Sequence, residues 1–186
     1  NLYWQQSIAP KEKLIAGQKY TVDELIERTI LYSDNTSAQI LSDNLPKEMI
    51  DRILSALNIQ IEREVGVYEN YITAKSYAGV FRILYNSSYL TRSYSNRSLE
   101  LLSNSDFKEG MRSVAKSGVK IASKFGERTT IESDGSETKQ LHECGIVYGN
   151  KGKEPYTFCI LTEGKDYKEL VLAIKAIGKQ IYEAND

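Results

Sequence analysis

The first half of the chain has its apolar residues at the spacing of amphipathic helices. Thr21-Val22-Asp23-Glu24 has the pattern of a capping box, in which the Thr21 hydroxyl and the Glu24 carboxylate each satisfy a free backbone N–H. The helix that follows breaks near Ser33-Asp34-Asn35, and a second helix continues after the break. A third helix begins at Pro46, and two more cover residues 74–86 and about 94–103.

The second half changes to the pattern of strands. Residues 119–123, 141–148 and 156–162 each read as a strand, and a final amphipathic helix covers about 166–183. This order predicts an α/β (α+β) fold: a helical half, then three antiparallel strands, then a helix that covers the sheet. We expect a single domain over residues 1–186, with the helical lobe at about 20–115 and the sheet plus terminal helix at about 118–186.

The composition is that of an ordinary globular protein, with 41% hydrophobic and 26% charged residues. A net charge of −1 with both signs interspersed argues against a nucleic-acid partner held by a basic face. No apolar run reaches the roughly 18 residues that a membrane span needs. Two cysteines and one histidine exclude a disulfide scaffold and argue against a zinc site, so no cofactor is expected.

Cys144 and Cys159 fall opposite each other if the last two strands pair with Tyr148 facing Pro155. Opposed residues share a face of the sheet and can lie close enough to form a bridge. Because bridges between neighbouring strands are strained, buried free thiols are expected in preference to a disulfide. His142 is expected on the surface of its strand.

Ser33-Asp34-Asn35 admits a structural and a functional interpretation. All three residue types favour caps and turns, so the triplet can be a simple helix break. The functional interpretation places a hydroxyl and a carboxamide on one rigid turn beside a cleft. The hydroxyl of Ser33 could relay a proton to a leaving nitrogen, and the carboxamide of Asn35 could hold a substrate amide.

Lys124-Phe125-Gly126 follows the first predicted strand and can be read in two ways. It can be an exposed lysine beside a strand-end glycine. In the functional interpretation the lysine attracts a substrate carboxylate, and the glycine lets a substrate lie along the strand edge without meeting a Cβ. The backbone N–H of Glu127, just beyond, could donate to an oxyanion.

Together these motifs resemble the class A β-lactamase and penicillin-binding-protein superfamily, over nearly the whole chain. The resemblance implies a serine β-lactamase/transpeptidase-like fold, in which the antiparallel sheet is flanked by the C-terminal helix and the helical lobe. The segments that carry the resemblance are Tyr20–Leu25 with Tyr32–Thr36, Ile121–Gly126, Cys144–Tyr148 and Pro155–Thr162. The resemblance implies that Ser33 relays a proton and that Lys124 faces the substrate carboxylate. It also implies that Asn35, Phe125, Gly126 and Glu127 form the substrate-binding positions.

The nucleophile of this superfamily lies in a Ser-x-x-Lys motif upstream of Ser-Asp-Asn. Only Ser7 precedes Ser33 here, and no lysine follows it at that spacing. Matches beginning at Ser105, Ser113, Ser117 and Ser136 are attributed to chance, because none leads into a long apolar helix. We therefore expect the chain to lack the N-terminal part of the fold, with the nucleophile and the first strands outside it.

Two further departures affect the chemistry that the resemblance implies. Phe125 replaces the usual Thr or Ser, so a hydroxyl that would bond a substrate carboxylate is lost, which weakens the case for an ordinary β-lactam. Counting forward from Ser33 puts Glu69 at about the place of the deacylating glutamate. Counting back from Lys124, and matching Ile72–Ala78 to the helix after the loop that bears this glutamate, puts Glu69 past that loop, and this second count is preferred because it uses more residues. Glu69 and Glu64 are then surface charges, and an acyl-enzyme would hydrolyse slowly, as in penicillin-binding proteins.

The resemblance thus implies acyl transfer through a serine ester on a β-lactam or a D-Ala-D-Ala-like peptide such as the peptidoglycan stem peptide. It also implies a bacterial, extracytoplasmic location, and this chain alone is expected to be inactive. The alternative is a degenerate relative that binds cell-wall peptide or has a structural role without turnover. A third option is a subunit completed by a missing N-terminal segment or by a second chain.

Overall fold

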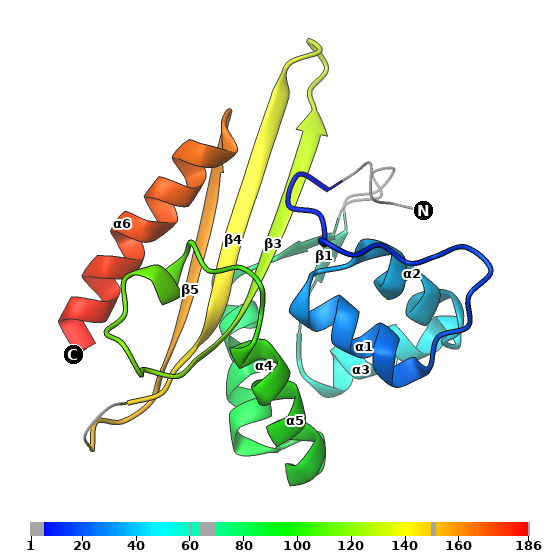
Figure 1. The fold of residues 1–186 in the computed structure, drawn as a ribbon, viewed down its shortest axis with the longest axis horizontal. Coiled ribbons are helices and arrows are strands. Elements are labelled where there is room, and N and C mark those ends of the chain that lie inside the picture. The colour runs from blue at the N-terminus through cyan, green and yellow to red at the C-terminus, as the bar shows by residue number, and fades with distance from the viewer. Residues whose placement is uncertain (1–5, 60, 64–69, 150–151, 186) are drawn as a thin grey trace.

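A computed structural model describes residues 6–59, 61–63, 70–149 and 152–185. Three strands form an antiparallel sheet in the order β3-β4-β5, and two short strands, β1 and β2, pair with each other (Figure 1). This mixed architecture confirms the fold class predicted from the sequence. The elements in chain order are α1 (Val22–Leu31), α2 (Asn35–Asp43), α3 (Lys47–Ala56), β1 (Ile61–Arg63), β2 (Asn70–Ile72), α4 (Ala74–Asn86), α5 (Arg92–Ser103), the 3-10 turn η2 (Met111–Ser113), β3 (Ile121–Ile131), β4 (Glu137–Val147), β5 (Tyr156–Gly164) and α6 (Tyr167–Asn185).

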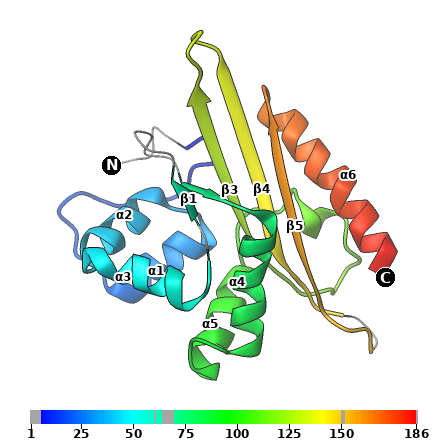
Figure 2. The same ribbon diagram turned by 180° about the vertical axis from the view of Figure 1, so that it is seen from behind.

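The three-stranded sheet is covered on both faces. The C-terminal helix α6 lies along one face, α4 and α5 pack against the other, and α1, α2 and α3 gather beyond β3 (Figure 2). Among the described helices, none is long and apolar enough to cross a membrane. The core on the α6 face includes Phe107, Met111, Ile121, Phe125, Leu141, Val147, Phe158, Ile160, Leu170 and Ile174, and the core on the other face includes Phe81, Leu99, Leu102, Ala122, Cys144 and Ile146.

Helix α1 begins with the capping box predicted from the sequence. The Glu24 N–H donates to Thr21 Oγ1 at 3.2 Å, and the Thr21 N–H donates to Glu24 Oε2 at 2.6 Å. Two of the four free N–H groups at this helix start are thereby satisfied by one reciprocal pair.

Strands β3 and β4 form a hairpin that extends well beyond the predicted strands. Ile121 pairs with Val147 at one end and Ile131 pairs with Glu137 at the other. The far half of the hairpin projects away from the helices (Figure 1), and Ile131 there is 74% exposed. This half was not predicted because none of its side chains is fully buried, and its sequence lacks the alternation of apolar and polar residues that marks a half-buried strand.

The predicted register of β4 and β5 is confirmed, whereas the predicted free thiols are wrong. Cys144 lies opposite Cys159, and the two residues form a disulfide across the strands with their Cα atoms 4.0 Å apart. Cys144 is fully buried in the core under α4 and α5. Strand pairing alone brings the two side chains together, and this proximity outweighs the general rule about strained cross-strand bridges on which the prediction rested.

Asp34 organises the turn between α1 and α2. This side chain is fully buried, and its Oδ1 accepts from the N–H groups of Thr36 and Ser37 at 3.0 and 3.1 Å. Its Oδ2 accepts from Ser37 Oγ at 2.9 Å and pairs with Arg28 Nε at 3.1 Å. Asp34 therefore caps α2 and anchors α1 to it, so the helix-break interpretation holds for this member of the triplet.

Replacing Asp34 with alanine should destabilise the protein by about 2–4 kcal/mol, because the variant loses a helix cap and leaves Arg28 without its buried partner. Urea unfolding at pH 7 measures this change. Asp43→Ala is the matched control, since the carboxylate of Asp43 is exposed at the other end of α2, where it accepts from Gln39. An Asp34→Ala variant as stable as the control would contradict the role assigned to this cap.

Removing the disulfide with the double variant Cys144→Ser/Cys159→Ser should lower the free energy of unfolding by about 3 kcal/mol. The bridge closes a loop with a sequence separation of 15 residues, and cross-linking a loop of about 15 residues stabilises a fold by roughly that amount. Denaturant unfolding of the wild type with and without a reductant provides the comparison. A reductant that changes the wild type but leaves the double variant unchanged identifies the disulfide as the cause.

Candidate active site

Lys124 and Ser33 meet where β3 passes the turn between α1 and α2. Lys124 Nζ donates to Ser33 Oγ at 2.6 Å, although the two residues are 91 positions apart in the chain. The same Nζ donates to the carbonyl oxygen of Phe125 at 2.6 Å. The structure thus brings together the hydroxyl and the amine that the sequence singled out.

Ser33 has a backbone conformation that turns it out of both helices. Its φ of 54° lies in the left-handed region that residues other than glycine rarely adopt. The N–H groups of Tyr32 and Asp34 both donate to the carbonyl of Arg28, at 3.1 and 3.3 Å, and so close the end of α1. Because α2 starts at Asn35, the hydroxyl of Ser33 stands at the junction and faces β3.

Lys124 lies in a poorly hydrated place for a charged amine. Burial lowers the pKa of Lys124 from 10.5 to about 7, and the carboxylate of Glu127 opposes this shift. The centroid of the Phe125 ring lies 4.4 Å from Nζ and adds a cation–π contact. Near neutral pH the amine is therefore present in both protonation states, as suits a group that gives up and regains a proton.

Phe125 directs its ring away from the helical lobe. The ring is buried in the core under α6 and stacks on Phe107 with the centroids 4.8 Å apart. The side chain is thus used in packing, and the position offers no hydroxyl to a ligand. Only the carbonyl of Phe125, through its hydrogen bond from Lys124, contributes a polar group to the site.

Gly126 and Glu127 line a cavity of about 380 Å³. A Cβ added at Gly126 would meet no atom within 4 Å, so the strand is open there. Tyr77 and His142 line the same cavity; burial raises the pKa of Tyr77 to about 12 and lowers that of His142, which keeps both side chains neutral near pH 7. His142, expected on the strand surface, is instead half-buried in a cavity wall.

Asn35 is the first residue of α2 and lies two positions after Ser33. Its backbone N–H donates to Gln6 Oε1 at 3.2 Å, and Gln6 Nε2 donates to the carbonyl of Ser33 at 2.8 Å. Nothing in the sequence singles out Gln6, because a glutamine in an irregular segment carries no pattern.

A family model described as the β-lactamase enzyme family matches residues 6–185. The chain belongs to the β-lactamase enzyme family. The superfamily resemblance drawn from the motifs is thereby confirmed. No curated protein matches the chain.

Solved structures of class A β-lactamases and of PBP-A share the fold of this family member. The chain is 16% identical to PBP-A, with a TM-score of 0.70. The match covers 95% of this chain and 67% of PBP-A. A class A β-lactamase from Mycobacterium abscessus is 17% identical, with a TM-score of 0.74, and the match covers 97% of this chain and 71% of that protein. A β-lactamase from Chitinophaga pinensis DSM 2588 is 14% identical, with a TM-score of 0.75, and the match covers 91% of this chain and 67% of that protein. The chain therefore spans about two thirds of the length of these proteins.

Glu143 is a buried carboxylate at the core of this β-lactamase-family domain that the sequence analysis did not single out. It is fully buried on β4, where it accepts from the N–H of Met111 at 2.7 Å and from Ser123 Oγ at 2.8 Å. Burial raises the pKa of Glu143, while these hydrogen bonds and the charge of Arg112 act against the shift. The sequence does contain a pattern that indicates burial of Glu143: Leu141 and Gly145 flank it at alternate positions, on the inward face of a predicted strand.

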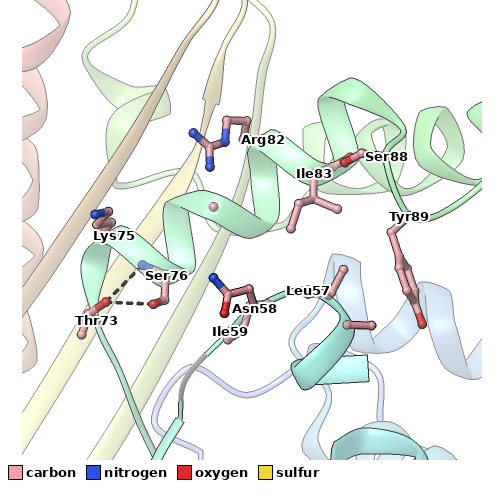
Figure 3. Close-up of a pocket in the computed structure, with 12 residues that line it drawn as sticks. Leu57, Asn58, Ile59, Thr73, Lys75, Ser76, Arg82, Ile83, Ser88 and Tyr89 are labelled. Atoms are coloured by element: carbon pink, nitrogen blue, oxygen red, sulfur yellow. Dashed lines mark hydrogen bonds between the residues drawn. The ribbon is translucent and has the colours of Figure 1, made fainter. Parts of the chain in front are cut away.

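Other features of the β-lactamase-family domain lie away from Ser33 and Lys124. A cavity of about 650 Å³ lies between the end of α3 and α4 and contains none of the predicted site residues (Figure 3). Glu64 and Glu69, expected to be surface charges, fall outside the described residues. Within the described segments, no group of three or more His, Cys, Asp or Glu side chains could hold a metal ion.

Lys124→Met should change how stability depends on pH. The pKa of Lys124 is lower in the folded protein, about 7, than its value of 10.5 in the unfolded chain, so the unfolded state binds more protons between these values. Wild-type stability should consequently rise from pH 7 to pH 10 relative to that of the variant, by about 1.4 kcal/mol for each unit of pKa difference. Parallel slopes for the two proteins, measured by urea unfolding, would rule out a buried titrating amine.

Proposed function

We propose that this chain carries the proton-relay and substrate-binding side of the active site of a β-lactamase-family serine hydrolase. The observation that supports this most directly is the 2.6 Å hydrogen bond from Lys124 Nζ to Ser33 Oγ. The complete protein transfers an acyl group through a serine ester, from a β-lactam or a D-Ala-D-Ala-like cell-wall peptide. The nucleophilic serine, and the base that deprotonates it, come from residues outside this chain.

Ser33 acts when the amide bond of the substrate breaks. The attacking serine forms an ester with the carbonyl carbon, and the nitrogen leaves as the C–N bond is cleaved. Ser33 Oγ gives its proton to this nitrogen and takes one from the ammonium of Lys124. The amine then regains a proton from solvent, which its pKa of about 7 permits near neutral pH.

The substrate lies along the open edge of β3. Gly126 leaves room for it there, since no atom would meet an added side chain within 4 Å. Asn35 holds the substrate amide, and the backbone N–H of Glu127 donates to the developing oxyanion. One of the similar solved structures, an acyl-enzyme complex of a PBP-A variant with penicillin G, is consistent with a ligand of this chemical class.

The protein acts outside the cytoplasm, at the bacterial cell wall. The disulfide between Cys144 and Cys159 supports this location, because such bonds persist in oxidising compartments and are rare in the cytosol.

A non-catalytic relative that binds cell-wall peptide is the second candidate. The observation that favours it is Phe125: its ring is buried against Phe107, so this position offers no hydroxyl to the carboxylate of a substrate. Such a protein would keep the pairing of Lys124 with Ser33 as structure and bind its ligand without turnover.

The full-length protein incubated with a fluorescent penicillin and with nitrocefin distinguishes these candidates. A stable covalent adduct supports the transpeptidase-like form of the proposal, and rapid nitrocefin turnover supports the β-lactamase form. The absence of both supports the non-catalytic relative. Intact-mass spectrometry of the same sample shows whether a second chain completes the fold.

Ser33→Ala in the full-length protein should slow acylation by about 100-fold or more, because relay of a proton to a leaving group contributes a factor of this size. Stopped-flow acylation by a chromogenic β-lactam measures the rate. Ser88→Ala is the matched control: Ser88 is exposed and lines the 650 Å³ cavity rather than the site. Equal acylation rates in the two variants would remove Ser33 from the reaction.

A further inference from the structure

The segment that precedes α1 crosses the candidate site. Figure 1 shows the N-terminal segment passing between β3 and the group of α1, α2 and α3. Gln6 in this segment spans the turn that carries Ser33: its Nε2 donates to the carbonyl of Ser33 at 2.8 Å, and its Oε1 accepts from the N–H of Asn35 at 3.2 Å. One carboxamide thus contacts the turn on both sides of Asp34.

The two groups that Gln6 contacts are ones that the turn itself leaves without a partner. The carbonyl of Ser33 points out of α1 because the backbone of Ser33 is left-handed, with a φ of 54°. The N–H of Asn35 belongs to the first turn of α2, where a helix supplies no internal acceptor. A left-handed residue other than glycine costs about 1–2 kcal/mol, so hydrogen bonds that satisfy this conformation hold it in place.

The same segment is tied to the opposite wall of the site. The N–H of Ile8 donates to Glu127 Oε1 at 2.6 Å, and Glu127 follows Lys124 on β3 by three positions. Residues 6–8 therefore form a strap, with Gln6 fixing the turn of Ser33 and Ile8 fixing the strand of Lys124.

We propose that Gln6 is a positioning residue, whose carboxamide locks the turn so that Ser33 Oγ stays in contact with Lys124 Nζ. This inference rests on the proposed function for its consequence in catalysis, but the positioning itself can be measured on the resting protein.

Gln6→Met tests the proposal, because methionine keeps the size of the side chain and removes both hydrogen bonds. The loosened turn should admit water to Lys124 and raise its pKa from about 7 by about one unit or more, since desolvation is the largest cause of the shift. The Cε chemical shift of Lys124, followed by NMR through a pH titration, reports this change. Gln39→Met is the matched control, because Gln39 is exposed on α2 and contacts only Asp43 among the hydrogen bonds described.

A purely structural role for Gln6 gives a different result. It would lower the melting temperature and leave the titration of Lys124 as in the wild type, and that outcome overturns the proposal. If Gln6→Met does not fold, Gln6→Ala replaces it, since alanine also removes both hydrogen bonds and adds no charge near Lys124. The expected result is again a rise in the pKa of Lys124, and an unchanged titration again overturns the proposal.

The full-length protein supplies a second measurement. Gln6→Met should lower the rate constant of acylation by about 10-fold, the equivalent of one or two neutral hydrogen bonds, and leave the dissociation constant of the β-lactam unchanged. Should the full-length wild type fail to be acylated at all, the proposed function fails, and the titration of Lys124 still decides the role of Gln6.

Discussion

The contact between Lys124 and Ser33 exists only while the helical lobe and the sheet are held together at the edge of β3. Lys124 comes from β3, an end strand of the three-stranded sheet, and Ser33 comes from the turn between α1 and α2. Their approach depends on Asp34, which joins α1 to α2 from inside, and on the short segment that bonds to both walls. Burial of the Lys124 amine lowers its pKa, so the amine can lose a proton near neutral pH. An exposed lysine would stay charged there.

The alternation of side chains along β3 separates the chemistry from the core. Lys124 shares its row with Cys144 and Cys159, on the face that α4 and α5 cover. The next residue, Phe125, points to the opposite face and packs with Phe107 under α6. Successive residues of one strand thus serve the site and the core in turn. A large ring at position 125 is accommodated because its neighbours on that face are apolar.

Much of this arrangement could be read from the sequence, and the failures have physical causes. The capping box at Thr21 and the pairing of Cys144 with Cys159 followed from local rules, and the geometry agrees with both. The outer half of the β3–β4 hairpin was missed because none of its side chains is fully buried, and the disulfide was missed because a general rule about strain was preferred to the register. Gln6 could not have been found, since its partners are 27 and 29 positions away and no periodicity links them. The pairing of Ser33 with Lys124 was anticipated only because two short motifs matched a known superfamily.

The carboxylate of Glu143 has a consequence for how this domain can change in evolution. A Cβ built on Gly110 would lie 1.8 Å from Glu143 Oε2 and 2.8 Å from the Phe107 ring, so no other residue fits beside this acid. Positions 110 and 143, which lie 33 residues apart in the sequence, therefore restrict each other's choice of residue. A descendant that acquires a side chain at position 110 must first shorten or lose the acid at 143, and we expect the pair to vary together wherever this fold has drifted.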